Sequence, residues 1–243
     1  MSSGRLARMA DGCAVVSAGD TNVMVVAVSK QKPNSSYSSF VPLTVDYRHK
    51  YSAAGRIPTN HLRREMGATE REILTARVID RSVRPQFPKG FNCETQLVCN
   101  LLSVDSVNSP DVLALNGASA ALALSDIPWN GPIGAVRVAL MPDNEVVTFP
   151  TRKESTEAQL NLILAANELG NVVMLEAFAN TPVEYNFLMK TLSKALKESK
   201  LIINAIKQLQ NSSAKPKRDI NELMAKPSEQ HYNAVKEYDF IIS

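Results

Sequence analysis

The sequence predicts a domain of mixed α/β class, and three observations support this prediction. The chain has 243 residues, of which 44% are hydrophobic and 21% charged, an ordinary composition for a globular protein with a full core. Short apolar runs rich in β-branched residues alternate with longer segments of helical periodicity. No apolar run reaches the length of a membrane span.

The first 50 residues predict three strands. Residues 15–29 have the pattern of a strand, a turn and a second strand, with Gly19, Asp20 and Thr21 at the turn. A polar loop follows, and residues 40–47 predict the third strand.

A basic segment comes next. Residues 48–89 contain ten Lys and Arg, eight of them Arg, against four acids, which gives this window a net charge of +6, whereas the whole chain carries only +3. The positive charge of the chain is therefore concentrated here. Guanidinium groups without matching acids usually face an anion, and their planar fork suits phosphate.

The second half of the basic segment predicts a helix that ends before Pro85. Thr69 and Glu72 have the spacing of a capping box at its start. Four apolar residues recur at helical spacing and are expected to face the core: Ile73, Ala76, Ile79 and Val83.

Three arginines of this helix, Arg77, Arg81 and Arg84, share one helical face. One interpretation is that Arg77 and Arg81 contact phosphate groups, together with Arg56 in the preceding loop. The alternative is a solvated face on which the arginines pair with Asp80. A single aspartate cannot neutralise three arginines, so the charge pattern favours anion binding.

The middle of the chain continues the alternation of strands and helices. Residues 95–107 predict a long strand, and residues 111–125 predict an apolar helix whose small side chains indicate burial and close packing. Four further strands, the first two forming a hairpin, are predicted at 135–140, 145–149, 160–165 and 172–177.

The last part of the chain predicts a change of domain. Residues 183–210 have the pattern of an amphipathic helix, and residues 211–218 are polar and basic, as in a flexible linker. Two short helical patterns follow, too short to bury a core alone. We therefore expect one domain at 1–210, and a linker with the beginning of an all-helical domain at 211–243.

The residues alone indicate no catalytic or metal centre. The three cysteines, Cys13, Cys93 and Cys99, match no zinc spacing, and the three histidines are scattered. The signatures of P-loops, dinucleotide-binding turns, zinc proteases and serine hydrolases are absent, and no acids cluster as a two-metal site requires. Without further comparison, the sequence predicts an arginine-rich α/β domain that contacts phosphate.

Three long strings, at residues 51–65, 72–88 and 116–138, closely resemble the polynucleotide phosphorylase family. The resemblance covers about residues 4–210 and implies the first of that family's two RNase PH-type cores. The implied fold is of the ribosomal protein S5 domain 2 type, with mixed sheets packed against helices. The tail resembles the start of the all-helical domain between the two cores.

The resemblance also implies an activity and partners. Members of this family form a homotrimeric ring around a channel for single-stranded RNA. With inorganic phosphate as co-substrate and Mg²⁺ as cofactor, they degrade RNA from its 3′ end to nucleoside diphosphates. The sequence of the basic loop resembles that of the animal mitochondrial members more than that of the bacterial members, which implies a mitochondrial location. Met1 to Arg5 show neither a signal peptide nor a transit peptide.

By resemblance, residues 60–64 line the constriction of the RNA channel. The implied RNA-binding residues are Asn60, His61, Leu62, Arg63 and Arg64. Bacterial relatives carry two aromatic residues where this chain has His61 and Leu62. His61 can still stack on a base, whereas leucine stacks poorly. The alternative for His61 is an ordinary exposed loop histidine, and Arg63 and Arg64 are expected to contact phosphates.

In the resembled family the working site lies in the second core, where a serine-rich helix start binds phosphate. The resemblance places its equivalent at residues 116–120, where alanines flank Ser119, so we expect Ser119 to permit close packing rather than to bind phosphate. Ser155, Asn161 and Ile163 stand where the second core has two aspartates and a lysine. We therefore expect this core to be catalytically silent and the Mg²⁺ site to lie outside this chain.

Two other function classes remain open. The first is a ring subunit of exosome type that binds RNA without catalysis; helical patterns after residue 210 argue against it, because such subunits end after their own core. The second is an RNA-binding module like ribosomal protein S5, and the helix with Arg77 and Arg81 argues against it.

Overall fold

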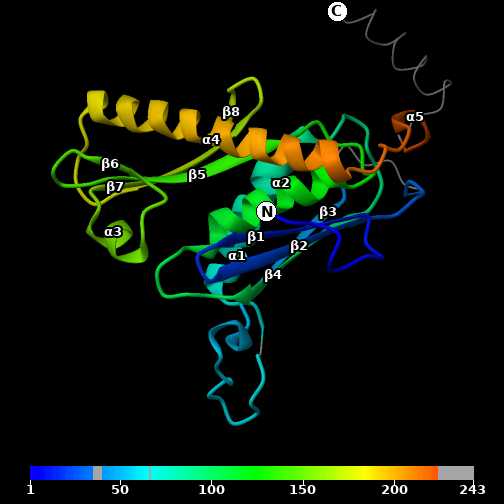
Figure 1. Ribbon diagram of the computed structural model, residues 1–243, viewed down its shortest axis with the longest axis horizontal. Helices are drawn as coiled ribbons and strands as arrows, with labels where there is room; N and C mark the ends of the chain where they lie inside the picture. Colours follow the sequence, from blue (N-terminus) through cyan, green and yellow to red (C-terminus); the bar gives the residue numbers. More distant parts are fainter. Residues whose placement is uncertain (35–39, 66, 224–243) are drawn as a thin grey trace, which may run out of the picture.

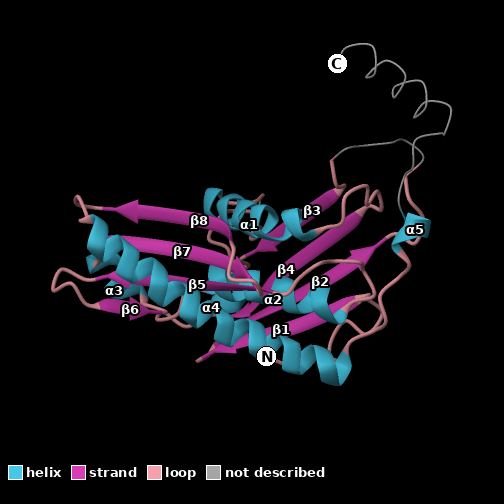
Figure 2. Cartoon of the chain, turned by 90° about the horizontal axis from the view of Figure 1, so that it is seen from above, coloured by secondary structure: helices cyan, strands magenta, loops and turns pink. Residues whose placement is uncertain are grey.

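A computed structural model describes residues 1–34, 40–65 and 67–223. The chain forms two four-stranded sheets, with helices packed between them and over them (Figure 1). Seen from above, the two sheets lie side by side and α2 occupies the middle of the domain (Figure 2). The mixed α/β class predicted from the sequence is thus confirmed.

The first sheet has the strand order β1-β2-β4-β3. Strands β1 (Gly12–Ala18), β2 (Thr21–Ser29) and β4 (Thr95–Ser103) are antiparallel neighbours, and β3 (Leu43–Arg48) runs parallel to β4. Gly19 has a φ of 57° in the turn between β1 and β2, a conformation that glycine adopts without steric cost. The predicted strand, turn and strand are confirmed.

The second sheet has the order β6-β5-β7-β8, and all its strands are antiparallel. Strands β5 (Ile133–Leu140) and β6 (Val146–Thr148) form the predicted hairpin, and β7 (Leu160–Asn167) and β8 (Val172–Ala179) are the two further predicted strands. A short helix that the sequence analysis did not predict, α3 (Arg152–Glu157), precedes β7.

The helices join the two sheets. Helix α1 (Glu70–Val83) packs on β3, and α2 (Pro110–Leu124) packs on β1 and β2. Helix α4 (Tyr185–Ser213) runs along the second sheet (Figure 1). Three short elements complete the described chain: the 3₁₀ helices η1 (Tyr51–Ala54) and η2 (Arg84–Gln86), and α5 (Ile220–Leu223).

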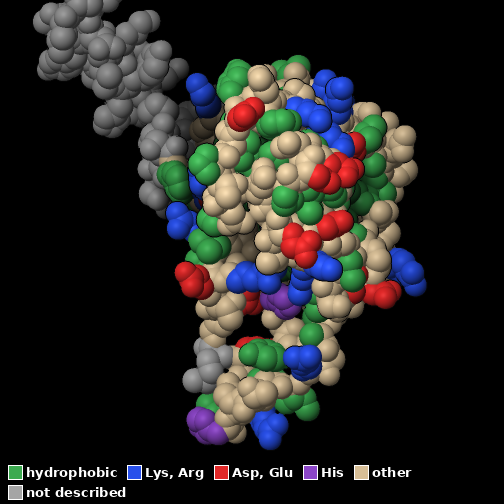
Figure 3. Space-filling view, turned by 90° about the vertical axis from the view of Figure 1, so that its left-hand side faces the viewer, with side chains coloured by type: hydrophobic (Ala, Val, Ile, Leu, Met, Phe, Trp, Pro, Cys, Tyr) green, Lys and Arg blue, Asp and Glu red, His purple; other side chains and the backbone are tan. Residues whose placement is uncertain are grey.

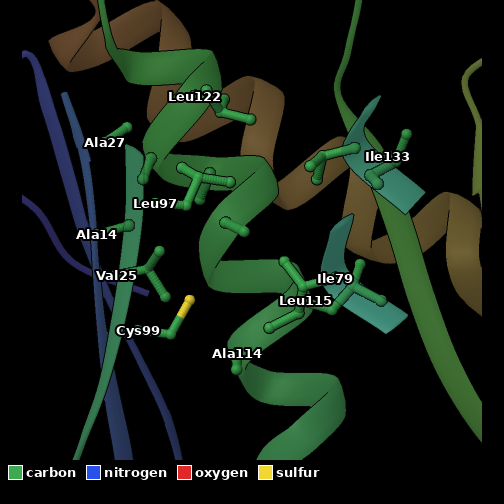
Figure 4. Close-up of a cluster of buried hydrophobic side chains, with 14 of the residues drawn as sticks. Ala14, Val25, Ala27, Ile79, Leu97, Cys99, Ala114, Leu115, Leu122 and Ile133 are labelled. Carbon is green, nitrogen blue, oxygen red and sulfur yellow. The ribbon is translucent and has the colours of Figure 1, made fainter. Parts of the chain in front are cut away.

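The core surrounds α2, which is buried on all sides as its apolar sequence predicted. Side chains of the first sheet, among them Val25 and Leu97, point toward α2 from one side, and Ile79 and Ile133 lie on the other (Figure 4). The start of β1 approaches α2 so closely that a Cβ atom at Gly12 would lie 2.1 Å from the carbonyl oxygen of Ala121. Only glycine fits at this contact.

Two expectations about packing are wrong. Ile79 and Val83 are fully buried, but Ile73 is 51% exposed, because the inner face of the first turn of α1 is taken by Glu72. The segment after α4 is not a free linker either. The backbone N–H groups of Lys215 and Arg218 donate to the carbonyl oxygens of Leu124 and Asp126, so this segment is attached to the end of α2.

Side chains strengthen this attachment. Lys217 Nζ donates to the carbonyl oxygens of Leu122 and Ser125, at the C-terminal end of α2, where a cation offsets the helix dipole. Of the two helical patterns expected within 219–243, only the start of the first is described, as α5; the rest lies outside the described residues, so the boundary near residue 210 stays a prediction. Among the described residues, no helix has the length and apolar character needed to cross a membrane.

Candidate nucleic-acid interface

A loop between β3 and α1, residues 49–69, projects from the body of the domain (Figure 1). It begins with η1 and contains the five residues for which RNA binding was expected. Figure 3 shows this projection below the body, with histidine and basic side chains toward its end. We call residues 60–64 the tip of the projecting loop.

Hydrogen bonds within the tip fix its shape. The side chain of Asn60 donates to the carbonyl oxygen of Arg64 at 2.6 Å and accepts from the Arg64 N–H at 3.2 Å. The Arg63 N–H donates to the carbonyl oxygen of Asn60 at 3.1 Å, and Arg63 has a φ of 53°. For a residue other than glycine, this left-handed conformation costs about 1–2 kcal/mol. Asn60 therefore shapes the tip, and its contact with RNA stays a prediction.

The other expected RNA-binding residues lie exposed on the tip. His61, Arg63 and Arg64 are exposed, and Leu62 is 50% exposed. Arg56 is also exposed, but it lies nearer the base of the loop, where its N–H donates to the carbonyl oxygen of Tyr51. The fold thus brings the tip residues together and holds Arg56 apart from them.

The base of the projecting loop is closed by one carboxylate. Glu72, at the start of α1, is 6% exposed. Its Oε1 accepts from the His49 N–H at 2.6 Å, and its Oε2 accepts from the N–H and the hydroxyl of Thr69 at 2.6 and 2.8 Å. The predicted capping box is confirmed. Its link to His49, 23 residues away along the chain, could not be read from local spacing.

Burial, hydrogen bonds and nearby charges shift the pKa values of Glu72 and His49 at the base of the projecting loop. Burial raises the pKa of Glu72, but the hydrogen bonds from His49 and Thr69 outweigh burial and hold the net pKa below its ordinary value. Burial lowers the pKa of His49, and the nearby guanidinium groups of Arg71 and Arg152 lower it further. The neutral imidazole is therefore favoured at His49.

A groove of about 780 Å³ separates the projecting loop from the first sheet. Arg48, Lys50 and Arg64 line it, and so do Glu65 and Glu72. Asp46 lines the groove as well and pairs with Arg48 at 2.8 Å, whereas Glu65 accepts from the Tyr51 N–H at 3.1 Å and Glu72 accepts as described. The sequence analysis did not single out Arg48 and Lys50; their place at the foot of a projecting loop depends on tertiary structure.

The arginines of α1 divide into two groups. Arg84 has a structural role. Its guanidinium pairs with Asp80 at 2.6 Å and lies over the Phe40 ring. It also donates to the carbonyl oxygens of Val41 and Leu43, at and just before the start of β3. Arg77 and Arg81 are exposed, and Arg81 lies 3.8 Å from Glu176 of β8. Asp80 is thus engaged by Arg84, and phosphate contact by Arg77 and Arg81 stays a prediction.

The residues expected to be silent lie on two elements: Ser155 is on α3, and Asn161 and Ile163 are on β7 of the second sheet. Asn161 donates through its side chain to the carbonyl oxygen of Ser155, and Ile163 packs against the core. None of these side chains supplies a carboxylate or an amine. Nearby, Arg152 Nε and Nη2 are buried and have no hydrogen-bond partner among the described residues.

The expected equivalent of a phosphate-binding helix start is misplaced. Residues 116–120 lie in the middle of α2, which begins at Pro110. Ser119 is fully buried and accepts from the Ile133 N–H, so its expected packing role is confirmed. The helix start carries Asp111, whose carboxylate pairs with the Arg137 guanidinium at 2.7 Å.

Comparisons with known proteins agree with this fold. Residues 1–128 match the model of the RNase PH family, described as the 3′ exoribonuclease family, domain 1. The chain is 43% identical over 218 residues to a polyribonucleotide nucleotidyltransferase of Koribacter versatilis, a match that covers 90% of this chain and 26% of the relative. The enzyme of Methylacidiphilum infernorum is 44% identical over 216 residues, covering 89% of this chain and 30% of the relative.

The chain therefore spans between a quarter and a third of the length of these curated relatives. Among solved structures, rice (Oryza sativa) Rrp46 superposes with a TM-score of 0.68 at 15% identity, over 86% of this chain and 92% of that chain, which shows the shared fold. The match of more than half the chain to one family model and the common fold lead to one conclusion: this chain belongs to the RNase PH, or 3′ exoribonuclease, family.

Proposed function

We propose that this chain is the N-terminal core of a phosphorolytic 3′-to-5′ exoribonuclease of the polynucleotide phosphorylase type, and that its task is to hold single-stranded RNA. The observation that carries this proposal is the exposed, internally closed tip that presents Arg63 and Arg64 on a projecting loop. Guanidinium groups in such a position suit the phosphates of a strand irrespective of its base sequence.

Catalysis is assigned to a second core. In phosphorolysis an oxygen of inorganic phosphate attacks the phosphorus of the last phosphodiester. The bond from that phosphorus to the 3′ oxygen of the preceding nucleotide breaks, and a nucleoside diphosphate leaves. The residues of this core do not fit the Mg²⁺ of such a reaction. Ser155, Asn161 and Ile163 offer no carboxylate, and the described residues contain no group of side chains suited to a metal ion.

The wider assembly belongs to the same proposal. Three copies of the full-length protein form a ring in which the projecting loops converge on an RNA channel. The protein is of the animal mitochondrial type and acts in mitochondria; this part of the proposal rests on the resemblance of the basic loop to that of the animal members. In this arrangement His61 stacks on a base while Arg63 and Arg64 hold the backbone.

The test is a double substitution, R63A/R64A, in the full-length protein. Binding of single-stranded RNA should weaken for all base sequences alike, and the slope of log affinity against log salt should become shallower by about one to two units. The control is R5A/R8A, which removes the same charge from exposed positions outside the loop. Fluorescence anisotropy over a series of salt concentrations measures both affinity and slope.

His61→Ala separates stacking from phosphate contact. It should lower affinity by about 1 kcal/mol or less and leave the salt slope unchanged, because no cation is lost. An R63A/R64A protein that binds RNA like the parent at every salt concentration overturns the assignment of the tip to RNA.

A further inference from the structure

The projecting loop is long, and its two ends meet at one side chain. The loop leaves the first sheet after β3 and returns to the body at α1, and between His49 and Thr69 the tip lies far out from the core (Figure 1). A loop of this length has many conformations, so its tip is held in place only if its base is closed. The carboxylate of Glu72 is the group that closes it.

The contacts of Glu72 join the entry of the loop to its exit. Oε1 accepts from His49, the residue that enters the loop, and Oε2 accepts from Thr69, the residue that leaves it. These are charge-assisted hydrogen bonds of 2.6 Å to a side chain that is 6% exposed, the short and strong class of hydrogen bond. Further out, Glu65 accepts from Tyr51, and Asn60 closes the tip, so that loop closure continues from base to tip.

We propose that Glu72 is the positioning residue of the projecting loop, and that its carboxylate sets where Arg63 and Arg64 meet RNA. The proposal rests on the proposed function, since it assigns a role in RNA binding to a residue that touches no RNA. Glu72 keeps the loop closed before RNA arrives. The conformational entropy of the loop is therefore already lost in the free protein and does not weaken RNA binding.

The competing explanation is that Glu72 only caps α1. The chain contains a matched case. Thr151 and Glu154 form a capping box at α3 in which the Thr151 N–H and hydroxyl donate to Glu154 at 2.7 and 2.8 Å. These distances nearly equal those at Thr69. Among the described residues, hydrogen bonds to Glu154 come only from Thr151, with no counterpart of the His49 bond.

The experiment compares E72Q with E154Q in the full-length protein. Glutamine keeps the size of the side chain, but its amide nitrogen cannot accept a hydrogen bond, so at least one end of the loop is released. Glutamine also serves at this position of a capping box, so a capping role predicts similarly small losses of thermal stability in both variants. The positioning role predicts in addition that E72Q alone weakens RNA binding; if the closed loop falls to about a tenth of the population, apparent affinity falls about ten-fold.

Two controls sharpen the result. E70Q removes the same charge from an exposed position in the same helical turn, so it reproduces the electrostatic change without opening the loop. Loss of a negative charge near an RNA site by itself favours RNA binding, so weaker binding by E72Q runs against the charge effect. T69V removes the capping hydroxyl but leaves the backbone N–H groups of His49 and Thr69 on Glu72, so under the positioning role it should lower stability and bind RNA more like the parent than E72Q does.

A second readout follows the loop without RNA. Trypsin cleavage after Arg63 and Arg64 should be faster in E72Q than in the parent, E70Q and E154Q, because an open loop is a better substrate. Equal RNA affinities for E72Q and E154Q, in a protein where R63A/R64A does weaken binding, overturn the positioning role. A parent-like R63A/R64A protein instead overturns the proposed function, so the two failures are distinguishable.

Discussion

Replacing Arg218 by alanine is expected to destabilise the whole domain, although Arg218 lies in a segment whose sequence predicts a flexible linker. Its guanidinium donates to both carboxylate oxygens of Asp126 at 2.9 Å, and it lies 3.2 Å from Asp11. It also donates to the carbonyl oxygens of Ser29 and Lys30. With a side chain only 15% exposed, Arg218 joins the end of β2 to the loop after α2.

The magnitude follows from what the truncation leaves behind. The side chains of Asp126 and Asp11 are 29% and 23% exposed, and both would lose the cation that neutralises them. Breaking a fully buried pair costs about 3–5 kcal/mol, and an exposed pair contributes less than about 1 kcal/mol. For this partly exposed pair we expect a loss of about 2–3 kcal/mol in the free energy of unfolding. In a chain of this size, that corresponds to a decrease in Tm of about 4–12 °C.

Urea unfolding followed by circular dichroism measures this loss. Lys153→Ala is the matched control, because it removes one cation from a side chain that is 85% exposed, and it should change stability by about 0.5 kcal/mol at most. In the parent, trypsin should cleave slowly after Lys215, Lys217 and Arg218, since these residues are bonded to α2 and its neighbours. If R218A is as stable as the parent, and the parent is cleaved first in this segment, the reasoning is refuted.

Two further predictions concern the silent core and the residue next to Arg218. The 243-residue chain, incubated with poly(A), inorganic phosphate and Mg²⁺, should release no ADP, because Ser155, Asn161 and Ile163 provide neither acid nor base; phosphate-dependent ADP release from a clean preparation would contradict the assignment. Burial lowers the pKa of Lys217 from 10.5 to about 8, with Asp126 opposing this only in part. Between these values the unfolded state binds more protons, so the stability of the parent relative to Lys217→Gln should rise from pH 8 to pH 10. Denaturation curves at both pH values test the sign, and a relative stability that falls with pH would show that the buried amine is not the cause.

The strands could be predicted from sequence because each is set by local pattern. Gly19 marks the first hairpin, and the alternation of Val23, Val25 and Ala27 with less buried neighbours marks β2. The tip was identified by resemblance, and its exposure in the structure agrees with a binding role. In α3, the capping box of Thr151 and Glu154 was a readable signal that the sequence analysis did not use.

Other features depend on distant parts of the chain. The exposure of Ile73 follows from the burial of Glu72, which is fixed by a bond to His49 and not by helical periodicity. The polar composition of residues 211–218 predicts a linker, yet α4 continues to Ser213, and Lys217 and Arg218 donate to carbonyl oxygens and carboxylates of elements far away in sequence. Composition cannot distinguish a solvated polar segment from one whose polar groups are all bonded to the core.

The projecting loop occupies a place in the chain where its length has little effect on the rest of the fold. Strands β3 and β4 are parallel, so the chain must cross back over the sheet between them, and α1 serves as that crossover. The loop is extra length added to a connection that the topology already requires. Because closure entropy grows slowly with length, residues can be inserted or exchanged at the tip while the pairing of β3 with β4 is preserved. Sequence change at positions such as His61 and Leu62 can thus alter the proposed contact with RNA almost independently of folding.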